Sequence, residues 1–126
     1  MHKPRTNTTI EEINKSLIEL MAQWRITAKD DEIIFTKIVG LQLKKIRLMR
    51  GYTQTRVAKA INITFQQLQK YERGTNECKA INLKKLSEYF DVSFDYFIKP
   101  ILDANLTFIT KRRENVYPFR QDYVAR

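Results

Sequence analysis

The fold of this chain is decided by residues 53–74, which read TQTRVAKAINITFQQLQKYERG. This stretch predicts two short helices joined by a tight turn. Thr53 and Thr64 are the expected N-cap residues of the first and second helix, because a threonine hydroxyl accepts a hydrogen bond from a free backbone N–H. Asn62 lies between the helices and tolerates the left-handed backbone that such a turn requires.

Apolar residues mark the inward face of both helices. Val57 and Ile61 lie four residues apart on one face of the first helix, and Ala58 is small enough for a second helix to cross closely above it. Leu68 and Tyr71 face inward from the second helix. The pattern is that of a helix-turn-helix unit, whose second helix enters the major groove of DNA.

The side chains left on the outward face of the second helix are suited to reading base edges. They are Phe65, Gln66, Gln67, Gln69 and Lys70. Glutamine reads adenine through two hydrogen bonds, lysine reads guanine, and an apolar ring packs on a thymine methyl group. We predict that Phe65, Gln66 and Lys70 make the principal base contacts, followed by Gln67 and Gln69.

The segment from about Val39 to Ile98 resembles the Cro/C1-type helix-turn-helix domain of phage repressors and of the bacterial Xre-family regulators. A small residue, a turn residue and two inward apolar residues occur in the family's order, at Ala58, Asn62, Leu68 and Tyr71. The family usually has glycine where this chain has Asn62. Residues 64–76 are similar to an alphaproteobacterial subgroup of the family.

This resemblance implies an all-α fold: a five-helix domain with an extra N-terminal helix and a C-terminal extension. It implies a homodimeric, sequence-specific regulator of transcription that binds double-stranded DNA, with half-sites about 34 Å apart. It also implies an ion pair between Arg47 and Glu72 that fixes the recognition helix. The phosphate contacts that it implies are Thr53, Gln54, Thr64, Arg73, Asn76 and Lys79.

The positive charge of the chain is concentrated around this unit. The formal net charge is +9 over 126 residues, yet residues 1–31 hold five basic and five acidic side chains. Residues 37–75 hold nine basic side chains against one acidic, and residues 76–99 hold four of each. Excess positive charge on one segment is typical of a surface that approaches the phosphate backbone. A merely solvated basic face is the alternative.

Helix signals flank the central unit. Thr8 or Thr9, followed by Glu11 or Glu12, resembles a capping box, and an amphipathic helix is predicted over about 10–25. Its apolar stripe either folds back on the core or pairs with a second copy of the chain.

Three further helices are predicted: one from about 32 to 50 that ends at Gly51, one over about 80–90, and a short last helix capped by Ser93. Pro100 is expected to end the domain. The predicted organisation is an N-terminal extension at 1–31, the DNA-binding domain at 32–99 and a C-terminal extension at 100–126.

The C-terminal extension leaves the function most open. It carries an apolar pentad at 106–110, a basic triplet at 111–113 and scattered aromatic residues. It can dock on a partner subunit or on the N-terminal helix, or remain a tail. One alternative function is an antitoxin that holds a toxin through residues 101–126 and regulates its own promoter. An adaptor without specific DNA affinity is another, and a partner such as RNA polymerase stays open.

Other classes of protein fit the sequence poorly. There is a single histidine, His2, no glycine-rich phosphate loop, and no nucleophile spaced for activation by a base, so we expect neither an enzyme nor a cofactor. The single cysteine, Cys78, offers no metal-ligand set and is interpreted as a small buried apolar residue, with a reactive thiol as the alternative. No apolar run could span a bilayer, and we expect a cytoplasmic, nucleoid-associated protein.

Overall fold

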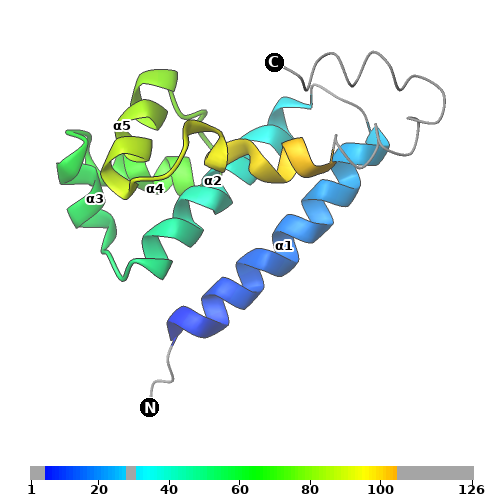
Figure 1. The fold of residues 1–126 in the computed structure, drawn as a ribbon, viewed down its shortest axis with the longest axis horizontal. Helices are drawn as coiled ribbons and strands as arrows, with labels where there is room; N and C mark the ends of the chain where they lie inside the picture. The colour runs from blue at the N-terminus through cyan, green and yellow to red at the C-terminus, as the bar shows by residue number, and fades with distance from the viewer. Residues whose placement is uncertain (1–4, 28–30, 105–126) are drawn as a thin grey trace.

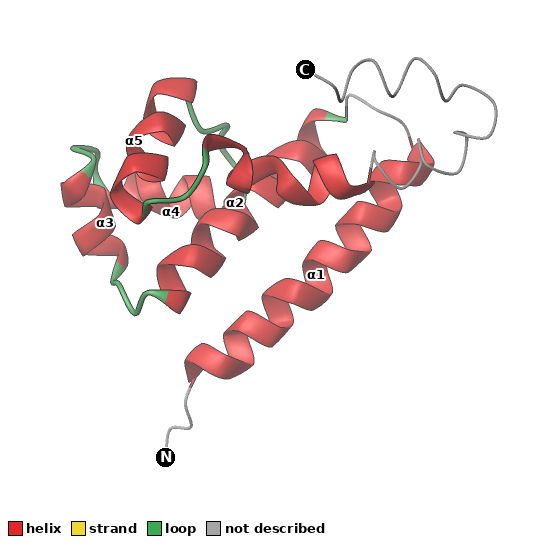
Figure 2. Ribbon diagram, viewed as in Figure 1, coloured by secondary structure: helices red, strands yellow, loops and turns green. Residues whose placement is uncertain are grey.

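The computed structural model describes residues 5–27 and 31–104, with the side chains of residues 5–9 and 27 excepted. These residues form helices and connecting loops, and no strand occurs among them (Figures 1 and 2). The elements are α1 (Arg5–Thr27), α2 (Glu32–Met49), α3 (Gln54–Ala60), α4 (Phe65–Arg73), α5 (Ala80–Phe90) and the 3-10 helix η1 (Phe94–Ile98). The prediction of an all-α fold is confirmed.

The two central helices begin at the residues that the sequence indicates. The hydroxyl oxygen of Thr53 accepts a hydrogen bond from the N–H of Arg56 at 3.0 Å, and that of Thr64 accepts one from the N–H of Gln67 at 3.0 Å. Asn62 makes the turn between them with φ of 61°. The left-handed backbone there is the conformation that asparagine tolerates better than most residues.

The core of the domain lies between α2, α3, α4, α5 and η1. Val57 and Leu68 are fully buried, as are the residues of α5 and η1 that close the core from the other side: Leu86, Phe90 and Phe97. Burying a leucine or phenylalanine removes enough apolar surface from water to contribute about 1.5–3 kcal/mol each. This shared core fixes α4 against its neighbours.

α2 crosses α4 at a glycine that sequence analysis did not single out. A Cβ atom at Gly40 would lie 2.3 Å from the backbone oxygen of Tyr71 and 2.8 Å from that of Glu72. Only a residue without a side chain allows the two backbones to approach so closely. Gly40 therefore allows the C-terminal end of α4 to pack directly on the backbone of α2.

The apolar stripe of α1 is covered within the chain. Ile13, Leu17 and Trp24 are buried in a second cluster that includes Ile34 and Ile38 of α2. The ring of Trp24 also lies 6.2 Å from that of Phe35, measured between centroids. Of the two alternatives for this stripe, packing on the core is the one observed, and α1 lies against α2 (Figure 1).

Two of the predicted helix caps were wrong. α1 begins at Arg5, so Thr8 and Thr9 lie inside the helix and cannot form its capping box. Adding residues to an existing helix gains a hydrogen bond for each one, which outweighs the weak helix preference of threonine. Ser93 precedes η1 but caps no backbone N–H, because its hydroxyl donates to the carboxylate of Asp95 instead.

The prediction that Pro100 ends the domain was also wrong, because the helical backbone continues through Pro100 as far as Ala104. Proline is compatible with the first turn of a helix, where its missing N–H would have no partner. Ile101 and Ala104 are buried in the cluster formed by α1 and α2. No helix in the part of the chain described here is long and apolar enough to cross a membrane.

Candidate nucleic-acid interface

α4 presents its first turns to solvent while its opposite face is buried. Leu68 and Tyr71 hold the inner face at 0% and 2% exposure, and Asn82 donates a hydrogen bond of 2.8 Å to the Tyr71 hydroxyl. Gly74 ends the helix with φ of 74°. The helix is thus fixed on one side and open on the other.

The predicted base-contact residues lie on this open side to different degrees. Phe65 is 39% exposed, and Gln66 and Lys70 are also exposed. Gln67 and Gln69 are half-buried. The three residues predicted to contact bases first are therefore the more accessible members of the set.

A buried ion pair ties the end of α4 to α2. The Nε atom of Arg47 donates to Oε2 of Glu72 at 2.6 Å, and its Nη2 atom donates to Oε1 at 2.9 Å. Arg47 also donates to the backbone oxygen of Tyr52 at 2.9 Å. The predicted contact is present. Because both donors of the guanidinium fork meet one carboxylate, the orientation of α4 is fixed as well as its distance.

Gln54 joins the same network, which the sequence did not indicate. Its side-chain amide donates a hydrogen bond of 2.9 Å to Oε1 of Glu72, from the first residue of α3. A glutamine amide has two donor hydrogens, so one remains for a DNA phosphate. Glu72 therefore links α2, α3 and α4, the supporting helix and both helices of the turn motif.

The other predicted phosphate contacts surround α4. Thr53, Thr64, Arg73, Asn76 and Lys79 are all exposed. The two threonines accept capping hydrogen bonds, and each hydroxyl keeps its own hydrogen for donation.

Arg56 is held by aromatic side chains. Its guanidinium lies 3.8 Å above the ring centroid of Tyr52 and donates a hydrogen bond to the Tyr89 hydroxyl. This arginine serves packing around the motif.

Cys78 lies in the loop between α4 and α5, half-buried beside the domain core. Burial raises the pKa of its thiol to about 12, because desolvation disfavours the thiolate. A protonated thiol is a poor nucleophile. These observations favour the interpretation as a small apolar residue over that as a reactive thiol. Among the described residues, no group of His, Cys, Asp or Glu side chains is placed to hold a metal ion.

Comparison with known proteins supports the assignment of a helix-turn-helix fold. Residues 43–97 match the model of the helix-turn-helix family HTH_3. A protein of Sinorhizobium medicae named as an HTH-type transcriptional regulator is 38% identical over 61 residues, 48% of this chain and 44% of its own. A regulator of the same type from Rickettsia conorii is 34% identical over 67 residues, 53% of this chain and 54% of its own. The matched segment thus spans about half the length of these relatives.

A solved structure shows the same arrangement of helices. The crystal structure of an HTH_3-family transcriptional regulator from Vibrio cholerae has a TM-score of 0.52 and 26% identity, covering 56% of this chain and 41% of that one. Residues 43–97 are therefore a helix-turn-helix domain of the Cro/C1 type, and several relatives come from alphaproteobacteria, as the resemblance implied. The N-terminal helix α1 lies outside the matched segment.

Proposed function

We propose that this protein is a sequence-specific transcriptional regulator that binds double-stranded DNA as a homodimer. Each α4 would enter the major groove of one half-site, and the half-sites would lie about 34 Å apart, one turn of the DNA helix. As such a regulator it would act in the cytoplasm, beside the chromosome.

The observation that carries this proposal is the exposure of Phe65, Gln66 and Lys70 on α4, whose inner face is buried at Leu68 and Tyr71. Gln66 would form two hydrogen bonds with an adenine edge, Lys70 would donate to guanine, and Phe65 would pack on a thymine methyl group. The half-buried Gln67 and Gln69 would contribute after a small rotamer change.

Phosphate contacts would place the helix in its groove. Arg73, Asn76 and Lys79 lie after the groove-entering part of α4, whereas Thr53 and Gln54 lie at the start of α3. These two groups would hold the backbones on either side of the groove, with Thr64 beside the base contacts. Such contacts supply affinity and register but no sequence preference.

The antitoxin alternative has no observation in its favour. Residues 105–126, most of the segment that would bind a toxin, lie outside the described residues, as do the apolar pentad and the basic triplet. The relatives are named as transcriptional regulators. These names favour the regulator over the antitoxin.

A binding assay on fragments of the source genome at several salt concentrations tests the proposed function. Specific recognition retains a few preferred fragments after salt has screened the phosphate contribution. Uniform loss of all fragments would contradict sequence-specific binding. Sedimentation of the protein with one preferred fragment then tests the dimer, because the proposal requires two chains for each duplex.

A further inference from the structure

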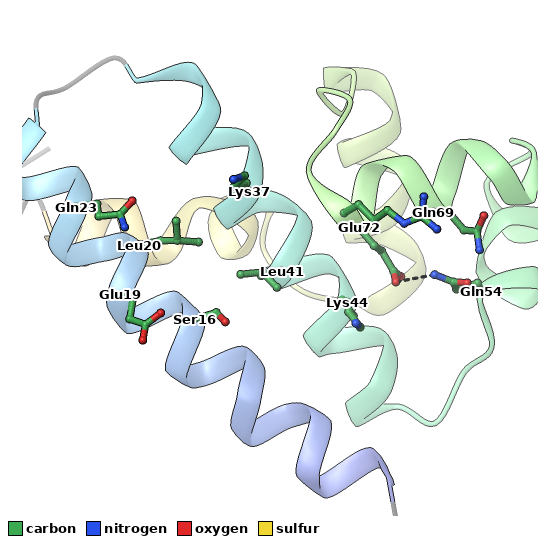
Figure 3. Close-up of a pocket in the computed structure, with 11 residues that line it drawn as sticks. Ser16, Glu19, Leu20, Gln23, Lys37, Leu41, Lys44, Gln54, Gln69 and Glu72 are labelled. Carbon is green, nitrogen blue, oxygen red and sulfur yellow. Dashed lines mark hydrogen bonds between the residues drawn. The ribbon is translucent and has the colours of Figure 1, made fainter.

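A groove of about 480 Å³ lies over α2 and separates α1 from α3 and α4 (Figure 3). One wall consists of side chains of α1, such as Glu19. The floor is the face of α2 that carries Lys37 and Lys44, seven residues apart and so on the same side of the helix. The far wall is made by α3 and α4.

The groove has an excess of positive charge that the fold does not neutralise. Lys37, Lys44 and Arg73 line it, and none of them forms an ion pair with a described residue. Glu72 also lines it, but its charge is matched by the buried Arg47. Glu19 on α1 is then the one unmatched carboxylate among the lining residues.

The groove is continuous with the surface proposed to bind DNA. Gln54, Gln69 and Arg73 belong to both, because α3 and α4 form the far wall. Lys37 and Lys44 therefore extend the row of phosphate candidates from α4 across α2 toward α1. Lys37 and α1 lie outside the segment that matches the HTH_3 family, whereas Lys44 lies inside it, so this extension joins the matched domain to the helix that precedes it.

We propose that this groove receives the sugar-phosphate backbone of the bound duplex, with Lys37 and Lys44 as additional phosphate contacts and Glu19 as a moderating charge. The inference rests on the proposed function and adds to it a second interface, built by α1 and α2. Phosphate oxygens are the acceptors that lysine ammonium groups bind as point charges. The Glu19 carboxylate opposes this binding across the groove.

The test measures binding of the full chain to a fluorescent 30-bp duplex of random sequence, over a series of KCl concentrations, by anisotropy. Random DNA suffices because phosphate contacts are independent of sequence. The double variant Lys37→Gln/Lys44→Gln should bind about 10-fold or more weakly, and the slope of log K against log salt should become shallower by about 2. The matched control is Lys85→Gln, which removes an exposed lysine of α5 that does not line the groove.

Glu19→Gln gives the opposite expectation, namely tighter binding to the same duplex, which damage to the fold could not produce. If the double variant and Glu19→Gln both bind as the Lys85→Gln control does, the inference is overturned while the proposed function stands. If the wild-type chain fails to bind the duplex even at low salt, the proposed function falls, and the inference with it. If the double variant instead loses only binding of inorganic phosphate, measured by calorimetry, the groove is a site for a free anion and the inference is again overturned.

Discussion

Arg47 and Glu72, 25 residues apart in the sequence, meet through two parallel hydrogen bonds of 2.6 and 2.9 Å in the interior of the domain. Their side chains are 9% and 3% exposed. Charges buried to this extent depend on each other, because neither keeps its hydration. This pair fixes the position of α4 on α2. It therefore also fixes the direction in which the outer side chains of α4 point.

Glu72→Ala should lower the free energy of unfolding by about 3–5 kcal/mol, since it leaves the Arg47 guanidinium buried without a carboxylate. Urea denaturation measures the effect. The control is Glu88→Ala, which removes a carboxylate 2.6 Å from Lys84 where both side chains are more than half exposed. There the loss should stay below about 1 kcal/mol. Equal losses in the two variants would show that the Arg47 pair is not buried in solution.

Gly40→Ala should destabilise the domain by about 1–3 kcal/mol, although alanine normally favours a helix over glycine by about 1 kcal/mol. The reason is the backbone oxygen of Tyr71, 2.3 Å from the added Cβ. Thermal unfolding followed by circular dichroism measures the change. Gly51→Asn is the contrast: Gly51 has φ of 73° with open space around it, and asparagine tolerates that backbone, so we expect less than about 1 kcal/mol. A Gly40→Ala variant more stable than wild type would refute the close crossing.

Trp24→Ala should cost about 3–5 kcal/mol, because the indole is buried between α1 and α2. Ile26→Ala on the same helix is the control, since Ile26 is 81% exposed and should matter little. Both are measured by urea denaturation of the full chain. If Trp24→Ala lowered the free energy of unfolding as little as Ile26→Ala, α1 would not be docked on α2. The groove between α1 and α4 would then have no wall on the α1 side.

Cys78 should give the protein a stability that falls in alkaline solution. In the unfolded chain its thiol ionises near the ordinary pKa of 9.0, whereas burial raises the folded pKa to about 12. Its contribution is fully present below pH 9 and is lost as the pH rises from 9 toward 12. Between pH 8 and pH 10, the wild type should therefore lose more unfolding free energy than Cys78→Ala. Parallel losses would contradict the raised pKa. Burial also raises the pKa of Tyr96 to about 12, but Tyr96 is present in both proteins, so its effect cancels when the two stability changes are compared.

The helices of the turn motif were predictable because their signals are local. Thr53, Asn62 and Thr64 act through backbone groups within three residues, so their roles follow from the sequence alone. The partnership of Arg47 with Glu72 needed the resemblance to a family, since no local pattern joins residues so far apart.

The features that the sequence did not reveal depend on tertiary approach. Gly40 is unremarkable until the backbone of α4 lies upon it. The hydrogen bond of 2.9 Å from Gln54 to Glu72, which Gln54 can make beside a phosphate contact, likewise depends on the approach of α3 to α4. From the sequence, Lys37 and Lys44 were only part of a basic segment. The groove that they line is completed by α1, a helix outside the motif. In each case the relevant partner comes from a distant part of the chain.

The most direct test of the account compares Gln66→Ala with Arg73→Ala, each on a preferred genomic fragment and on random DNA of the same length. Gln66→Ala should cost about 1–3 kcal/mol of binding free energy on the preferred fragment and almost nothing on random DNA. Arg73→Ala should weaken both and reduce the salt slope by about 1. Equal losses on the two DNAs for Gln66→Ala would contradict the claim that the outer face of α4 reads bases.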